Sequence, residues 1–230
     1  MIKNSTDEYP KPSLLTQLII RLRQVFFSGS QDYWTKRYLL GGNSGKGSYG
    51  GSAEFKSRVL NQFVRENNIR SVTEFGCGDG NQLTYADYPK YTGLDISEQA
   101  VKLSSTLFDG DLSKKFFVYD PDEIEKNKKK FSADLVISLD VIYHLVEDDV
   151  YRKYLKNIFN CSKRCVVIYS SNEETNGLLH SRHVRHRKFT KNIDEWFPSW
   201  KLIKIIKSDQ LECEIKEKDP QVDFYIFHSL

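Results

Sequence analysis

Apolar and polar residues follow two different periods along this chain. Short β-prone runs that end at acidic, glycine or polar residues predict strands at 71–75, 88–95, 114–119, 133–140 and 165–170. Apolar residues that recur every three or four positions predict helices at 13–27, 31–40, 52–67, 97–108, 148–160 and 190–197, the last capped by Thr190. The unbroken apolar run of 133–140 is typical of the centre of a parallel sheet. Strands that alternate with helices in this way predict a doubly wound, mainly parallel α/β fold.

Both ends of the chain depart from that alternation. Two β-prone runs at 200–208 and 223–229, with charged residues between them, predict an antiparallel hairpin. Before the first strand, 41–51 holds so many glycines that regular structure is excluded, which leaves a flexible linker or a folded lid. The lid is favoured because Lys46 and Tyr49 are functional side chains that a linker does not need. We therefore divide the chain into a lid segment, 1–51, and a catalytic domain, 52–230.

Three alternating glycines follow the strand at 71–75. Gly76, Gly78 and Gly80 allow positive φ angles and the close approach of a ligand. A helix that opens at Asn81 would add free backbone N–H groups. A plain turn with a helix cap is the alternative. The combination of strand, glycine turn and helix start predicts a polar ligand over the turn.

The strand at 88–95 ends in an acidic residue, Asp95, and Ser97 can cap the next helix. In a doubly wound fold, a carboxylate placed about 20 residues after the glycine turn accepts hydrogen bonds from ribose hydroxyls. The alternative is a loop or capping aspartate. We favour a nucleoside-binding carboxylate because the glycine turn precedes it.

Two of these stretches resemble a known family. Glu74-Phe75-Gly76-Cys77-Gly78-Asp79-Gly80 is similar to the first motif of class I S-adenosylmethionine-dependent methyltransferases, and Gly93-Leu94-Asp95-Ile96-Ser97 is similar to the second. A nicotinamide dehydrogenase would show the longer G-x-G-x-x-G spacing. The resemblance covers most of the chain and implies a seven-stranded Rossmann-like sheet, with the terminal hairpin as its last two strands.

The resemblance also implies a donor site. S-adenosylmethionine would lie over the glycine turn, with its ribose on Asp95 and its adenine near Asp120. The alternative for Asp120 is a turn aspartate before a proline. The product would be S-adenosylhomocysteine. The full set of candidate cofactor-binding residues is Tyr33, Trp34, Glu74, Gly76, Cys77, Gly78, Gly80, Asp95, Ile96, Asp120 and Asp140.

Candidate catalytic groups follow the buried strand 133–140, because ligands of open α/β sheets bind at the carboxyl ends of strands. His144 is the best candidate for a general base, since an unperturbed imidazole titrates near neutral pH. Tyr143 and Tyr49 are alternatives. An acceptor oxygen that is already ionised, as on a phosphate, would need no base.

A basic segment at 179–189 predicts the acceptor site. Arginine side chains pair well with carboxylates and phosphates, so an anion site is favoured over a plain surface patch. The candidate acceptor-binding residues are Lys46, Tyr49, His180, Arg182, His183, Arg185 and Arg187. The His-Val-Arg-His-Arg run, and the Gly-Asn-Ser-Gly and Gly-Ser-Tyr-Gly lead-in, resemble bacterial methyltransferases associated with surface-glycan synthesis. This implies O-methylation of a polar or anionic precursor of a capsule or surface polysaccharide, such as a sugar or a phosphate- or phosphoramidate-bearing molecule.

Composition restricts the partners. A net charge of +3 does not demand a nucleic-acid partner, and the four cysteines have no metal-ligand spacing, so we expect no metal. No apolar run is long enough for a membrane span. Reduced cysteines favour the cytoplasm. We expect a monomer or homodimer acting on a small molecule or glycan precursor; the helix at 13–27 packs on the domain, on a second subunit or on a membrane surface.

Other functions stay open from sequence alone. An N-methyltransferase would use the same donor site. An NAD-dependent oxidoreductase would share the glycine turn, although the glycine spacing and the terminal hairpin argue against it. A non-catalytic nucleotide-binding partner subunit would bind the donor without using His144 or Arg185.

Overall fold

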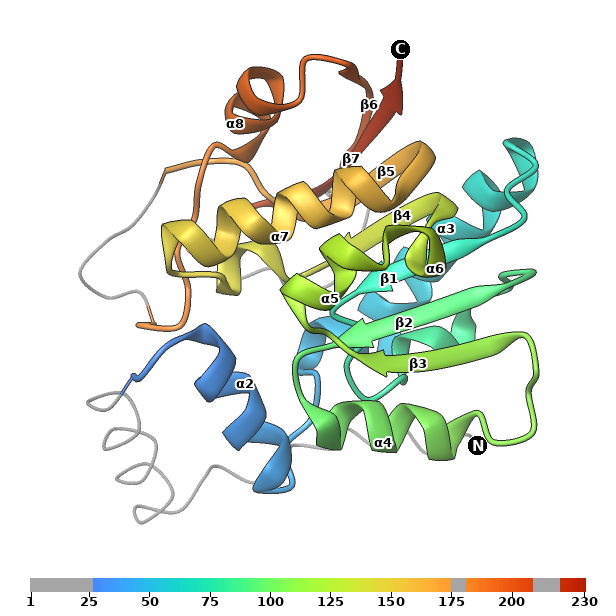
Figure 1. Ribbon diagram of the computed structural model, residues 1–230, viewed down its shortest axis with the longest axis vertical. Helices are drawn as coiled ribbons and strands as arrows, with labels where there is room; N and C mark the ends of the chain where they lie inside the picture. Colours follow the sequence, from blue (N-terminus) through green and yellow to red (C-terminus); the bar gives the residue numbers. More distant parts are fainter. Residues whose placement is uncertain (1–26, 175–180, 209–219) are drawn as a thin grey trace, which may run out of the picture.

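The computed structural model describes residues 27–174, 181–208 and 220–230. They contain a seven-stranded sheet with the order β3-β2-β1-β4-β5-β7-β6 (Figure 1). The strands are β1 Val72–Phe75, β2 Tyr91–Asp95, β3 Lys114–Val118, β4 Ala133–Leu139, β5 Ser162–Ser171, β6 Trp200–Ile206 and β7 Val222–Ser229. Strands β1 to β5 pair in parallel, and β7 pairs antiparallel with both β5 and β6. The predicted Rossmann-like sheet and its terminal hairpin are confirmed.

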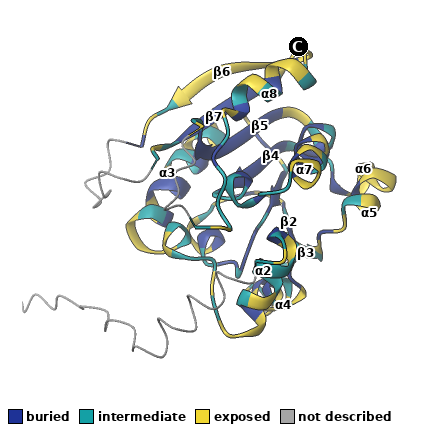
Figure 2. Ribbon diagram, turned by 90° about the vertical axis from the view of Figure 1, so that its left-hand side faces the viewer, coloured by how far each residue is buried: buried dark blue, intermediate teal, exposed yellow. Residues whose placement is uncertain are grey.

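Helices cover both faces of the sheet. They are α2 Ser30–Leu39, α3 Gly50–Glu66, α4 Glu98–Leu107, α5 Pro121–Lys126, α6 Lys128–Phe131, α7 Asp148–Cys161 and α8 Phe189–Trp196. One core cluster joins α3 to the strands, through residues such as Leu60 and Leu135. A second cluster packs the four helices from α5 through α8 against the opposite face of the sheet, through residues such as Leu155 and Val166. Figure 2 shows the central strands buried between these layers and β6 exposed at the edge. Apolar burial on both faces accounts for the continuous apolar run of β4.

Of the predicted lid segment, residues 27–49 are described and precede α3. These residues, called the lid from here on, lie at the carboxyl ends of the strands. In Figure 1 the arrowheads of β2 and β3 point toward α2. Ser30 fixes one end of the lid, because its backbone N–H and hydroxyl donate to the Glu147 carboxylate at 2.8 and 2.6 Å. The other end contains the short 3-10 helix η1 Lys46–Ser48 and is fixed by Asp79, which accepts hydrogen bonds from the Ser44 N–H and the Tyr49 hydroxyl at 2.9 and 2.8 Å. The glycine-rich stretch is therefore folded against the glycine turn.

The element after the glycine turn differs from the prediction. Instead of a helix, the chain forms the single 3-10 turn η2 Gln82–Tyr85 and then returns to β2. Gln82 is buried against α3, where its amide donates to the Ala53 carbonyl and the Ser57 hydroxyl at 2.9 and 2.7 Å. Because α3 already covers this part of the sheet, and Pro89 follows shortly, no room or chain length is left for a longer helix.

Three smaller expectations meet different outcomes. Helix α8 begins at Phe189 with Lys188 as its N-cap, so the predicted cap at Thr190 is wrong; the Thr190 hydroxyl bonds Asn172 instead. The described part of the basic segment, 181–188, forms no strand. Most of the predicted helix 13–27 lies outside the described residues. None of the helices in the described residues is long and apolar enough to cross a membrane.

Candidate active site

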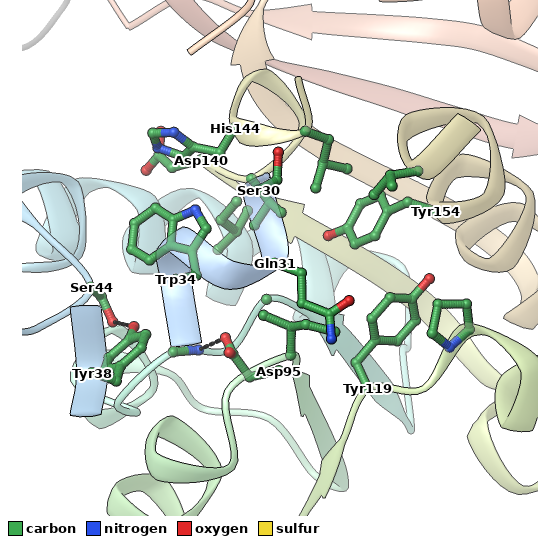
Figure 3. Close-up of a pocket in the computed structure, with 18 of the residues that line it drawn as sticks. Ser30, Gln31, Trp34, Tyr38, Ser44, Asp95, Tyr119, Asp140, His144 and Tyr154 are labelled. Atoms are coloured by element: carbon green, nitrogen blue, oxygen red, sulfur yellow. Dashed lines mark hydrogen bonds between the residues drawn. The ribbon is translucent and has the colours of Figure 1, made fainter. Parts of the chain in front are cut away.

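A cavity of about 360 Å³ opens at the carboxyl ends of β1, β2 and β4, under the lid (Figure 3). This volume lies within the range of small-molecule sites. Six of the predicted residues besides the catalytic candidate His144 line it: Trp34, Gly76, Gly78, Asp95, Ile96 and Asp140. The sheet order places β2 and β4 on opposite sides of β1, so the cavity has a β2 end and a β4 end.

The β2 end is built around Asp95. Its two carboxylate oxygens accept the N–H groups of Gly78 and Ser97, each at 2.9 Å, which ties the glycine turn to the start of α4. Burial raises the pKa of Asp95 to about 6, and the two backbone bonds oppose that shift. The carboxylate is therefore largely ionised near neutral pH. Tyr119 and Pro121, which follow β3, complete this end.

The glycine turn supplies space rather than free donors. The N–H groups of Gly76 and Cys77 donate to the Leu94 carbonyl, that of Gly80 to the Cys77 carbonyl, and that of Asp79 to the Ser44 hydroxyl. With the Gly78 bond to Asp95, every N–H of the turn has a partner. These five residues therefore present no free N–H group, and the usual cradle for a pyrophosphate is absent from them. This geometry does not favour a dinucleotide.

The lid presses closely on the turn. Gly78 has a φ of 60°, and a Cβ built there would lie 2.2 Å from Ser44 Oγ and 2.8 Å from Tyr38 Oη. Tyr38 and Ser44 bond each other at 2.8 Å, and burial keeps the Tyr38 pKa far above its usual range. The glycine at position 78 is required for this close approach.

His144 lies at the β4 end, on the 3-10 turn η3 Ile142–His144. Its Nδ1 is 3.1 Å from the His183 carbonyl oxygen, and because a carbonyl only accepts, Nδ1 carries the proton. Burial lowers the pKa of His144 to about 4, so the ring is neutral and Nε2 holds a lone pair. Nε2 makes no hydrogen bond within the described part of the chain. Trp34 packs edge-on against this ring, with the two ring centroids 4.9 Å apart.

Asp140 stands beside His144 and carries a second set of polar contacts. Its Oδ2 accepts from Lys56 Nζ at 2.6 Å and its Oδ1 from the Tyr143 hydroxyl at 3.0 Å. Burial, followed by the nearby Asp140 charge, raises the pKa of Tyr143 well above its usual range. Tyr143 is therefore a protonated donor to Asp140 in this arrangement.

Other predicted residues take positions outside the cavity lining. Tyr49 donates to Asp79, and burial raises its pKa to about 12. Glu74 accepts from Tyr91 at 2.6 Å, and its burial raises its pKa to about 7. Asp120 caps α5, accepting from the Asp122 and Glu123 N–H groups. The remaining predicted positions have other surroundings: Cys77 is buried against Gly93, Gly80 packs on Ser104 and Phe108, Tyr33 stacks on His183, and Lys46 is exposed.

The basic segment turns mostly toward the protein. Arg187 donates to the Leu145 and Val146 carbonyls at 2.6 and 2.7 Å and pairs with Asp148 at 3.0 Å. Arg185 donates to the same Val146 carbonyl and pairs with Asp148 at 2.9 Å. These bonds hold the loop that carries His144. Arg182 is exposed, His183 stacks on His144 with ring centroids 5.5 Å apart, and the predicted His180 lies outside the described residues.

Sequence reasoning missed several lining residues and one buried charge. The missed lining residues include Ser30, Gln31, Tyr38, Ser44, Ser48, Tyr119, Pro121, Lys153 and Tyr154. Tyr38 follows Trp34 by one helical turn, so the two share a face of α2, and that spacing could have revealed it. Lys56 interrupts the apolar stripe of α3, and a lysine at a core-facing position indicates a buried ion pair.

Comparisons with known proteins agree with this geometry. A family model described as a methyltransferase domain matches residues 73–164. No curated protein matches the chain. The match confirms the predicted methyltransferase class for this part of the chain.

Solved structures share the fold at low sequence identity. The N-methyltransferase NodS from Bradyrhizobium japonicum, in complex with S-adenosyl-L-homocysteine, is 12% identical, with a TM-score of 0.66 over 88% of this chain and 99% of that chain. Magnesium protoporphyrin IX methyltransferase from Synechocystis, also with this product bound, is 13% identical, with a TM-score of 0.58 over 92% and 100%. An S-adenosylmethionine-dependent methyltransferase from Clostridium acetobutylicum is 14% identical, with a TM-score of 0.56 over 75% and 90%.

Proposed function

We propose that this chain transfers a methyl group from S-adenosylmethionine to an oxygen atom of a small polar acceptor. The observation that carries the proposal is the pairing, in one cavity, of a β2 end lined by Asp95 and Tyr119 with an unprotonated imidazole nitrogen of His144 at the β4 end. The cofactor and the enzyme class rest on the domain match. The nature of the acceptor rests on the side chains described above.

The β2 end fits the methyl donor. Gly76 and Gly78 leave room beside the turn, Asp95 offers carboxylate oxygens to ribose hydroxyls, and Tyr119 offers an aromatic wall to a base. S-adenosylmethionine supplies a methyl group on a positively charged sulfur, which is open to in-line attack. The protein residues need only hold the two reactants in line and exclude water. The lid, through Trp34 and Tyr38, covers the cavity on its solvent side.

In this proposal, His144 is the general base that accepts the proton of the acceptor hydroxyl. Its Nδ1–H is committed to the His183 carbonyl, so the ring keeps one orientation and one tautomer. Nε2 can then accept a hydroxyl proton as the acceptor oxygen becomes a better nucleophile. A depressed pKa of about 4 makes this a weak base, which suits transfer during the reaction rather than before it.

For the acceptor we propose a polar precursor of a bacterial surface glycan, a sugar in the first instance. Support comes from the resemblance of 41–51 and 179–189 to glycan-associated methyltransferases. A phosphate- or phosphoramidate-bearing precursor is the variant in which an anion contacts the exposed part of the basic segment, at Arg182. Arg185 and Arg187 are engaged with Asp148, which makes them weaker candidates for direct acceptor contact.

Methyl transfer tests the proposal directly. We expect the purified chain to bind S-adenosylhomocysteine in calorimetry, and to methylate members of a panel of free sugars, sugar phosphates and nucleotide-activated sugars. Radiolabelled S-adenosylmethionine gives the rate, and NMR of the product distinguishes an O-methyl from an N-methyl group. Binding of NADH without binding of S-adenosylhomocysteine would reject the proposal. Methyl transfer to nitrogen alone would reject the part of the proposal that names oxygen as the acceptor atom.

A further inference from the structure

We propose that Asp140, held in place by buried Lys56, binds an uncharged hydroxyl group of the acceptor next to the atom that is methylated. This inference rests on the proposed function and narrows it. The β4 end of the cavity would take a polyhydroxyl compound, and any anionic group of the acceptor would lie outside it. Lys56 is then a positioning residue that acts through Asp140.

The ion pair is built into the core. Lys56 lies on α3 and is only 1% exposed, and its Nζ is 2.6 Å from Asp140 Oδ2. A lysine at such a site needs a partner, because an unpaired buried charge is strongly destabilising. Its carbon stem packs in the same stripe as Phe55 and Leu60, and Nζ lies 5.4 Å from the Tyr169 ring centroid. The position of α3 therefore sets the position of the carboxylate.

Asp140 is held in an unusual backbone conformation. Its φ is 60°, in the left-handed region that non-glycine residues seldom adopt. Its N–H donates to the Tyr169 carbonyl at 3.0 Å. The hydrogen bonds from Lys56 and Tyr143 to its carboxylate also hold the residue in place. Residues kept in such conformations by several contacts cluster at ligand sites, so the backbone of Asp140 supports a ligand-binding role for its carboxylate.

The carboxylate has hydrogen-bonding capacity left over. An ionised carboxylate offers about four acceptor sites, of which Lys56 and Tyr143 use two. The backbone of the lid passes close by, since a Cβ on Gly47 would lie 2.8 Å from Oδ2. The side chain is still 16% exposed and lines the cavity beside His144 (Figure 3). The remaining acceptor sites are therefore available to a ligand that donates.

The same end of the cavity is unsuited to an anion. Asp140 presents negative charge and His144 presents a lone pair, so a phosphate there would meet repulsion that no unpaired cation among the described lining residues offsets. Lys56 lies behind Asp140, and Lys153, which lines the cavity, pairs with Asp122 at 2.5 Å. Two neighbouring hydroxyls fit instead, because one can donate to Asp140 and the other to His144.

The test uses the full chain saturated with S-adenosylhomocysteine. Saturation-transfer NMR measures binding of glucose, N-acetylglucosamine and their 1-phosphates. The variants are Asp140→Asn, Lys56→Met and the double variant, with Lys156→Met as the matched control. Lys156 forms an exposed ion pair with Glu125, and neither residue lines the cavity, so its loss should leave sugar binding unchanged. Circular dichroism confirms that each variant is folded at the temperature of measurement.

We expect a neutral sugar to bind the wild-type complex, and each single variant to weaken binding about tenfold or more, since a hydrogen bond to a charged group is lost or misplaced. Affinity for S-adenosylhomocysteine should stay within about threefold. The double variant removes both charges, so its melting temperature should recover toward the wild type while sugar binding stays weak. A purely structural ion pair would recover both.

Three results would overturn the inference: recovery of sugar binding in the double variant, unchanged binding in Asp140→Asn, or a wild-type complex that binds none of the neutral sugars. If the sugar 1-phosphates bound more tightly than the neutral sugars, and this binding were lost in Asp140→Asn, the inference that anions are excluded from the β4 end would be overturned. Failure of S-adenosylhomocysteine to bind is a different outcome, because it rejects the proposed function itself.

Discussion

The two ends of the cavity are built in different ways. The β2 end consists of the glycine turn and Asp95, which lie within about 20 residues of each other and are bonded mainly through backbone groups. The β4 end combines Asp140 and His144 with Lys56 from α3, Trp34 from the lid and the His183 carbonyl. The first is a local motif, and the second is an assembly of distant segments.

This difference separates binding from reaction. Substitutions at the β2 end should reduce donor affinity, whereas substitutions at the β4 end should reduce turnover or acceptor binding and leave donor affinity nearly unchanged. The lid contacts both ends, through Ser44 on the turn and Trp34 on His144. The following predictions test that division, beginning with the largest expected effect.

Replacing His144 by Asn should lower kcat about a hundredfold or more, because general-base catalysis contributes at least that factor. The asparagine amide can still donate to the His183 carbonyl, so the loop should keep its position while the Nε2 base is lost. Donor affinity, measured by calorimetry with S-adenosylhomocysteine, should change less than about threefold. Full activity in this variant would show that the acceptor needs no base from His144.

Replacing Gly78 by Ala should weaken S-adenosylhomocysteine binding about tenfold or more. The new Cβ would lie 2.2 Å from Ser44 Oγ, so the lid would have to move away from the turn. Gly41→Ala is the matched control, because Gly41 also has a positive φ, 77°, but nothing lies within 4 Å of its Cβ position. Equal losses in the two variants would assign the effect to backbone strain rather than to the lid contact.

The histidine should also make stability depend on pH. The folded pKa of His144 is about 4 against 6.5 for the free side chain, so the unfolded chain binds more protons between these values. Stability from this residue is complete above pH 6.5 and is lost as the pH falls toward 4. The wild type should lose about 2 kcal/mol of unfolding free energy near pH 5 relative to its value near pH 7.5, beyond any loss in His144→Asn.

The comparison with His144→Asn is needed because Glu74 and Asp95 act in the opposite direction. Their pKa values are raised to about 7 and about 6, so they add stability as the pH falls. Urea unfolding at several pH values measures the difference. Parallel curves for the two proteins would mean that His144 is not held neutral by the fold.

Tyr49→Phe should have the smallest effect. It removes one exposed hydrogen bond to Asp79, worth about 1 kcal/mol or less, while Ser44 still holds the lid. We expect the KM for S-adenosylmethionine to rise about two- to fivefold, with kcat retained. A hundredfold fall in kcat would instead support Tyr49 as the base.

The sequence contained enough information for the sheet and for the β2 end. Alternation of β-prone runs and helices predicted the mainly parallel sheet with its terminal hairpin, and Gly76, Gly78 and Asp95 were found because their spacing is local. The helix expected after Gly80 failed, because its length depends on α3, which already packs on that part of the sheet. Local spacing carries no information about such competition.

The β4 end could be predicted only in part. His144 and Asp140 were found because they follow a buried strand, but the partners that give them their chemistry come from elsewhere in the chain. Arg185 and Arg187 looked like an anion site from composition, yet both pair with Asp148, which no spacing rule connects to them. Charge in a sequence does not say whether a side chain faces a ligand or its own protein.

A crystal structure of the chain grown with S-adenosylhomocysteine tests the central claim most directly. Our account predicts density for the nucleoside between Gly78 and Tyr119, with its ribose hydroxyls on Asp95 and its sulfur directed toward His144. Density at another place, or a glycine turn that stays filled by the lid with no ligand bound, would contradict it.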